Sequence, residues 1–385
     1  MKKYISMMGW KFAVGYTMVG IALLGYSYTQ VDLGLTLTKA SIARSIQTWF
    51  QHIGYFDRPL STAIFLLLIF ALFVLYGCIL KAIKDKKLTG TEIWISIATI
   101  VLTTCIAYPA FSYDFFNYLF TAKTVLVYHK NPYVVTPLQF AGFDPWLSFM
   151  HWTHLASAYT PLWIVVTLIP YFFSFGYFLP LIWSLKIVIA ISYILAAIGI
   201  GKILEKEDTG RTLLGIAIFA FNPLIIIECL VSPHNDILMM TMAIWAIVLY
   251  QQKKKWLSWL LLSGSVAMKL MTIFLIPAFF TGFKRRITLA CIMIGFLAVL
   301  TQREALSWYW VWVVPFVALV PDISVFMILA TGVSLGLLLQ YAPFLYYGNW
   351  NDPVPLLKLW VTWIPIGLSV IIALVSTIKK RQKTN

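Results

Sequence analysis

One acidic residue stands where an apolar run gives way to a long polar loop. Asp114 lies between Tyr113 and Phe115 at that boundary. A carboxylate that is partly desolvated among aromatic rings holds a proton more strongly, which suits it to act as a general base. Asp is equally suited to cap the N-terminus of a helix. The sequence therefore predicts a base at Asp114 and leaves the capping role open.

A second acidic cluster follows a later apolar run. His234, Asn235 and Asp236 form a polar turn, and Glu228 lies just before it within the run. His234 and Asp236 could bind a divalent cation such as Mg²⁺ or Mn²⁺, but two ligands fall short of a full site. A hydrogen-bonded turn or a contact to a sugar hydroxyl remains open. Glu228 should face the protein interior and find a partner there, because an unpaired carboxylate at membrane depth is costly.

Two basic residues could hold an anionic group. Lys269 is the lone charge in an apolar hairpin, and its burial requires an anionic partner, such as a lipid phosphate. Arg303 precedes Trp308 and Tyr309, and its guanidinium suits phosphate oxygens. Arg303 could instead pair with Glu304 or extend to the headgroups. Cations here would offset the charge that grows on a carrier phosphate as a glycosidic bond breaks.

Polar and aromatic side chains recur along the loop that begins near residue 111. Aromatic faces could stack on sugar rings or on a polyprenyl tail, although Tyr and Trp favour the membrane interface in any case. A Gly-rich nucleotide-binding loop is absent from the sequence, which favours a lipid-linked donor. The loop residues that we expect to contact substrate are Tyr113, Asn117, Asn131, Tyr133 and Tyr159.

The chain that must position these residues is too apolar for a soluble domain. Of its 385 residues, 61% are hydrophobic and only 11% are charged, and apolar runs close to the roughly 20 residues that cross a bilayer recur along it. The net charge of +15 would suggest nucleic acid in a soluble protein. Here the basic clusters lie beside the ends of apolar runs, as cytoplasmic loops do. We therefore expect an integral membrane protein that binds no nucleic acid.

The apolar runs predict an all-α polytopic membrane protein, a single domain over residues 1–385 with about ten transmembrane helices and both termini cytoplasmic. Residues 111–160 form a long extracytoplasmic loop with short juxtamembrane helices, and residues 160–178 a half-inserted helix on the same side. Residues 256–283 begin and end at basic clusters but are too few for two full spans, so they predict a broken or re-entrant hairpin with its apex near Lys269. The expected spans are 10–28, 60–81, 91–110, 180–201, 212–231, 237–251, 286–302, 306–321, 323–341 and 357–378.

Several motifs follow one another in a familiar order between residues 108 and 312. Asp114 follows a span, and after it come Asn131-Pro132-Tyr133, Tyr159-Thr160-Pro161-Leu162, Asn222-Pro223-Leu224, His234-Asn235-Asp236, Ala267-Met268-Lys269-Leu270 and Trp308-Tyr309-Trp310. In these motifs the chain resembles the GT-C superfamily of glycosyltransferases. In particular, it resembles bacterial polyprenyl-phosphate-mannose-dependent mannosyltransferases, including alpha-1,6-mannosyltransferases.

The resemblance implies a GT-C-like helical bundle with an extracytoplasmic active site. The basic, apolar composition and the short loops fit a bacterial inner (plasma) membrane, and an archaeal membrane would suit them equally well. The resemblance also implies inverting transfer of a sugar, mannose above all, from a polyprenyl-phosphate carrier to a lipid-linked or glycan acceptor of the cell envelope. Asp114 would be the base, and Asp236 would supply a second acidic motif. The chain lacks the paired acidic residues that some relatives have beside Asp114, so the resemblance does not settle whether a metal takes part.

Two other classes remain open. A transporter or flippase of lipid-linked sugars would show two related halves and charges at mid-membrane, whereas the polar residues here gather at the outer ends of the spans. An inactive scaffold is the third possibility, and it would tolerate substitution of Asp114.

Overall fold

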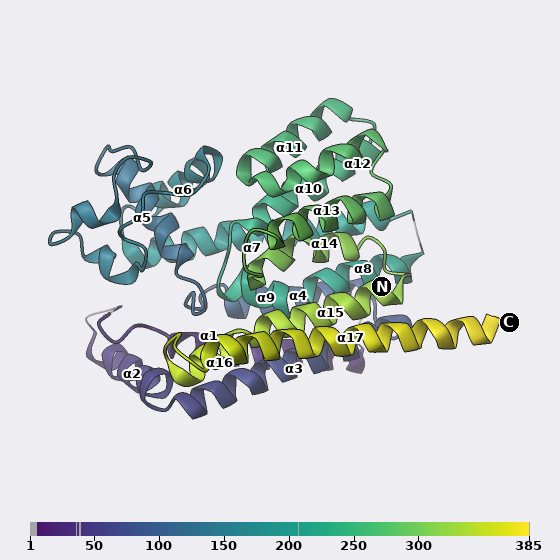
Figure 1. The fold of residues 1–385 in the computed structure, drawn as a ribbon, viewed down its shortest axis with the longest axis horizontal. Helices are drawn as coiled ribbons and strands as arrows, with labels where there is room; N and C mark the ends of the chain where they lie inside the picture. Colours follow the sequence, from purple (N-terminus) through teal and green to yellow (C-terminus); the bar gives the residue numbers. More distant parts are fainter. Residues whose placement is uncertain (1–5, 36, 38–39, 207, 385) are drawn as a thin grey trace.

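The computed structural model describes residues 6–35, 37, 40–206 and 208–384, and this part of the chain is helical without a strand (Figure 1). Among these described residues, five helices are long and apolar enough to cross a membrane. They are α1 (Met7–Tyr28), α3 (Arg58–Lys84), α7 (Phe178–Leu204), α15 (Ser324–Leu339) with its continuation α16 (Tyr341–Tyr347), and α17 (Val354–Thr384).

The expected count of about ten spans is not confirmed, because several of the predicted spans are short or broken. A sixth span results if α8 is joined to the segment that follows it, across a bend of 53°. That bend falls at Asn222-Pro223, where proline disfavours helical geometry in the residue before it. The helices involved are α4 (Gly90–Thr104), α8 (Thr209–Ala220), α9 (Pro223–Ile226), the π-helical η4 (Ile227–Val231), α10 (Asp236–Gln251), α13 (Arg285–Leu300), the 3₁₀-helical η6 (Ser307–Trp312) and α14 (Val314–Val317).

The buried centre of the bundle is formed by the segment from α8 to α10, which packs against α7 and α11 (Lys255–Met268). Helices α1 and α4 run side by side in the same direction, since a side chain at Gly9 would meet Glu92 and one at Gly20 would meet Thr103. The start of α1 therefore lies level with the start of α4. The end of α4, which leads to Asp114, lies at the other end of the bundle.

A small lobe projects from that end of the bundle and is formed by the segment between α4 and α7 (Figure 1). Asp144 organises it, because its carboxylate accepts hydrogen bonds from the Lys123 ammonium at 2.8 Å and from the Tyr128 hydroxyl at 2.7 Å. Lys123 also lies 4.0 Å from the Trp146 ring centroid. The lobe contains α5 (Asp114–Leu126), two 3₁₀ helices, η2 (Pro137–Phe140) and η3 (Pro145–Phe149), and α6 (Pro161–Phe173).

The segment predicted as a broken hairpin consists of α11, the 3₁₀ helix η5 (Leu270–Leu275) and α12 (Ile276–Phe280). Helix α11 stops at Met268, and Lys269 is extended, with φ −163° and ψ 130°. The Met268 carbonyl, which the broken helix leaves without an internal partner, accepts a 2.8 Å hydrogen bond from the Thr160 hydroxyl. The break is thereby tied to the lobe that carries Asp114. The remaining helices, α2 (Ser41–Gln51) and the π-helical η1 (His52–Phe56), lie between α1 and α3.

Candidate functional site

Asp114 is the first residue of α5, at the base of the lobe. Its backbone N–H donates to the Ser112 hydroxyl at 3.3 Å, and the residue remains partly exposed, although Ser112 and Phe115 are buried. Burial raises the pKa of Asp114, and the nearby Asp236 adds to the rise, whereas His234 and Lys269 oppose it. The helix N-terminus favours the carboxylate as well. Asp114 thus combines access to a ligand with a strengthened affinity for a proton.

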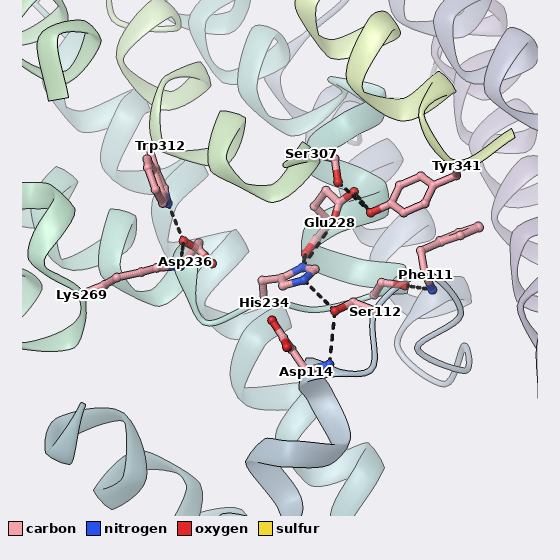
Figure 2. Close-up of polar contacts among 11 residues, drawn as sticks. Phe111, Ser112, Asp114, Glu228, His234, Asp236, Lys269, Ser307, Trp312 and Tyr341 are labelled. Atoms are coloured by element: carbon pink, nitrogen blue, oxygen red, sulfur yellow. Dashed lines mark hydrogen bonds and ion pairs between the residues drawn. The ribbon is translucent and has the colours of Figure 1, made fainter. Parts of the chain in front are cut away.

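His234 connects the Asp114 turn to the bundle core (Figure 2). Its Nε2 lies 3.0 Å from the Ser112 hydroxyl, and its Nδ1 lies 3.3 Å from a carboxylate oxygen of Glu228. The imidazole is buried and stacks on Trp308, with ring centroids 4.6 Å apart. Both nitrogens therefore contact protein groups, and Ser112 links the imidazole to the backbone of Asp114.

Glu228 is completely buried in η4, and one of its carboxylate oxygens has the interior hydrogen-bond partner that its depth requires. The Tyr341 hydroxyl donates to one of its oxygens at 2.8 Å, and Ser307 lies 2.7 Å from that hydroxyl. His234 contacts the other oxygen. The carboxylate consequently joins η4, η6 and α16 beneath the polar turn (Figure 2).

Asp236 forms the second acidic centre and is paired with Lys269. The Lys269 ammonium lies 2.7 Å from a carboxylate oxygen that also accepts a hydrogen bond from the Trp312 indole. The ammonium sits near the rings of Tyr309 and Trp312, at 5.6 and 5.3 Å from their centroids. Asp236 is 1% exposed, whereas the Lys269 side chain is 33% exposed. The anionic partner that the hairpin lysine requires is thus a protein carboxylate, and the lysine still has a face open to a ligand.

Lys186 joins the segment before Asp114 to the segment before His234 through hydrogen bonds to their backbones. This residue of α7 is buried, and its ammonium donates to the carbonyls of Ala107, Leu230 and Val231 at 2.7, 2.8 and 3.0 Å. An ammonium has three protons, so all of its donors are used. One carbonyl belongs to the segment that leads to Asp114, and the other two belong to η4. Our reading of the sequence did not single out this lysine, although a lone cation within a long apolar run is a signal of function.

The predicted loop residues divide into those that approach Asp114 and those that support them. Tyr159 lies against Asp114 and Asn117, and burial raises its pKa. The Tyr133 hydroxyl donates to the Tyr159 carbonyl at 2.7 Å, and the Asn131 side chain accepts from the Tyr133 N–H at 3.0 Å. Tyr133 and Asn131 therefore hold the segment that carries Tyr159.

The other predicted residues lie at the edges of the site. Tyr113 directs its hydroxyl to Asp32, at 3.2 Å, and stacks on His151. Asn235 is buried at the start of α10. Arg303 is exposed. Its neighbour Glu304 forms an ion pair with Lys358 at 2.6 Å and not with Arg303, the partner considered in the sequence analysis.

His234 and Asp236 were the candidates for a divalent cation. Within the described residues, no group of three or more His, Cys, Asp or Glu side chains is arranged to hold a metal ion. Both ring nitrogens of His234 face Glu228 and Ser112, and one oxygen of Asp236 is used by Lys269 and Trp312. The present side-chain positions direct these two residues to protein partners.

The fold and the site define a helical integral membrane protein with a polar, partly exposed acidic centre at one end of its bundle. A family model described as alpha-(1->6)-mannopyranosyltransferase, N-terminal domain, matches residues 13–285, more than half of the chain. The chain therefore belongs to this family, MptA_B, whose members are mannosyltransferases of the GT-C type. No curated protein and no solved structure matches the chain. The match includes Asp114, His234, Asp236 and Lys269, whereas Tyr341 lies beyond it.

Proposed function

We propose that the protein transfers mannose from a polyprenyl-phosphate carrier to a hydroxyl of a glycan or glycolipid acceptor, with inversion, and that Asp114 is the general base. The observation that carries this proposal is the placement of Asp114. Its carboxylate is partly exposed, its pKa is raised by burial, and it lies within the electrostatic reach of Lys269 and His234.

In the proposed step, Asp114 accepts the proton of the acceptor hydroxyl as that oxygen bonds to the anomeric carbon of mannose. The bond from this carbon to the phosphate oxygen breaks at the same time, and the electron pair leaves with the polyprenyl phosphate. A single displacement of this kind inverts the anomeric centre. The open face of Lys269 would bind the phosphate and offset its growing charge, with Arg303 as a second cation further out.

The remaining site residues have positioning or recognition roles in this proposal. Glu228 orients His234, which in turn fixes Ser112 and the backbone of Asp114. Tyr159 and Asn117, which lie against each other beside Asp114, would contact sugar hydroxyls, and Asn235 would do so from the start of α10. The rings of Trp308 and Tyr309 offer apolar faces to the sugar or the carrier, because aromatic rings stack on such surfaces.

We assign the site to the extracytoplasmic side because basic residues gather at the opposite end of the bundle. Lys81 and Lys84 lie in the last turn of α3, and Lys202 lies in the last turn of α7. Cytoplasmic loops carry such an excess of basic residues. A bacterial plasma membrane suits this arrangement, with the donor presented by its lipid tail.

The test is mannose transfer by purified wild type and Asp114→Asn, with polyprenyl-phosphate mannose and its glucose analogue as donors. Loss of a general base lowers the rate by about 10²- to 10⁴-fold, and we expect this loss while donor binding is retained. Asp57→Asn is the matched control, because Asp57 caps α3 and Asn caps a helix equally well. Equal transfer by Asp114→Asn would remove the base from the mechanism. Carrier movement across proteoliposomes without any transfer would favour a transporter.

A further inference from the structure

A groove lies between α3, α15 and α17, far from Asp114. It has a volume of about 660 Å³ and is walled mainly by apolar side chains, among them Phe73, Leu335, Leu368 and Ile372. The three helices run together along one side of the bundle (Figure 1). Only 17% of the residues in the most apolar stretch of α17 are buried within the protein. This side of the protein therefore faces the surrounding bilayer.

One end of the groove is charged. Lys81 and Lys84, both exposed in the last turn of α3, line it together with Asp85. The Asp85 carboxylate lies 3.2 Å from the Lys87 ammonium, so that lysine offsets its charge. Two cationic groups, Lys81 and Lys84, thus lie at one end of the apolar groove. This combination is complementary to a lipid with an anionic head.

One glycine of the lining, on α3, leaves open space beside the groove. Gly77 lines the groove from α3, and a side chain added there would meet no atom within 4 Å. The space that such a side chain would fill is therefore open. An acyl chain could occupy it without displacing any protein group.

The groove is remote from the proposed mannose transfer. Its charged end lies at the end of α3, beside the start of α4, and Asp114 follows the far end of α4. The 15 residues of α4 place about 22 Å between these levels of the bundle. A donor whose phosphate is held at Lys269 cannot also place that phosphate at Lys81 and Lys84.

We propose that this groove is a binding site for an anionic phospholipid of the leaflet opposite the Asp114 site. One acyl chain lies along α3 past Gly77, and the phosphate is held by Lys81 and Lys84. The proposal does not depend on the transferase activity, and its test uses no turnover.

The test is lipid binding by the full-length, delipidated protein, measured by native mass spectrometry with phosphatidylglycerol and with phosphatidylcholine of the same acyl chains. We expect wild type to prefer phosphatidylglycerol. Lys81→Gln/Lys84→Gln should weaken that binding on the order of thirty-fold, from about five-fold for each basic residue near anionic lipid. The matched control is Lys253→Gln/Lys254→Gln, two exposed lysines after α10 that lie outside the lining, which should retain the preference.

A second variant tests the apolar part independently. Gly77→Leu should displace about two methylenes of the bound chain and weaken binding roughly ten-fold, while Gly367→Leu, at an exposed helical glycine with equally open space, should not. Equal binding of the two lipids by wild type, or equal losses in the control variants, would overturn the proposal. Polyprenyl phosphate binding in place of phosphatidylglycerol, or a change of oligomeric state in Gly77→Leu, would assign the groove to another occupant and overturn it as well.

Discussion

The pair formed by Asp236 and Lys269 should respond unequally to removal of its two members. Lys269→Met leaves the Asp236 carboxylate, 1% exposed, with the Trp312 indole as its remaining donor. Asp236→Asn leaves an ammonium on a side chain that is 33% exposed and can be hydrated. A stranded buried charge is costly, whereas a charge that reaches solvent is not. The lysine substitution should therefore be the more damaging one.

The size of the difference follows from the burial of each partner. Breaking a buried ion pair lowers the free energy of unfolding by about 3–5 kcal/mol. Because Lys269 is partly exposed, we expect Lys269→Met to cost about 3 kcal/mol, the lower end of that range. Asp236→Asn should cost about 1 kcal/mol, as for a lost hydrogen bond. Because the asparagine removes the stranded charge, the double variant should be about as stable as Asp236→Asn alone.

The measurement is a double-mutant cycle on the free energy of unfolding in mixed detergent micelles, which isolates the coupling between the two residues. We expect a coupling of about 2–3 kcal/mol. Equal costs for the two single variants, summing in the double variant, would show that the pair seen in the structure carries no coupling. That result would return Lys269 to the role of a free phosphate-binding cation.

Three further outcomes are expected. Since burial raises the pKa of Asp114, transfer should increase with pH through that raised pKa, and a profile that is flat from pH 4 to about pH 8 would contradict its role as base. Because the pKa of Asp114 is raised in the folded state, the wild type loses stability as pH rises through that pKa. Asp114→Asn should therefore unfold at a higher temperature than wild type at pH 7 and at the same temperature as wild type below about pH 4. An equal difference in unfolding temperature at both pH values would show that the raised pKa of Asp114 is not its cause. Lys186→Met leaves three buried carbonyls without the ammonium that donates to them. It should lower kcat on the order of 10²-fold, as misplacement of reacting groups does, with little change in the binding of the sugar donor. An unchanged kcat would show that the Lys186 contacts do not position the site.

The sequence predicted the polar end of the bundle better than the helices that build it. Asp114 is distinctive because it ends an apolar run, and the need of Glu228 for an interior partner follows from its depth alone. The number of spans was harder to predict, because apolar composition is the same in a straight helix and in one that breaks at Asn222-Pro223. Hydropathy predicts where the chain is apolar, while packing decides whether it continues as one helix.

The partners of charged residues depend on contacts between distant parts of the chain. Lys269 meets Asp236 across 33 positions, and only the folded bundle brings α10 and the break after α11 together. The acceptors of Lys186 could not be predicted for the same reason, since they are backbone carbonyls that the sequence cannot distinguish from any others. The catalytic role of Asp114 and the substrate roles of the other site residues remain predictions.

The Lys186 contacts also bear on how the protein is made. When α7 enters the membrane, Leu230 and Val231 follow it in the chain and have not yet packed against it, so two of the three acceptors of the Lys186 ammonium are missing. A lysine at the centre of a span disfavours insertion by about 2.5–3.5 kcal/mol, and the cost is smaller for Lys186, which lies nearer the start of α7. Stable residence of α7 in the bilayer should therefore wait for the η4 segment to emerge from the ribosome. Biogenesis of the catalytic end would then be a late event, completed only after more than half of the polypeptide has been translated.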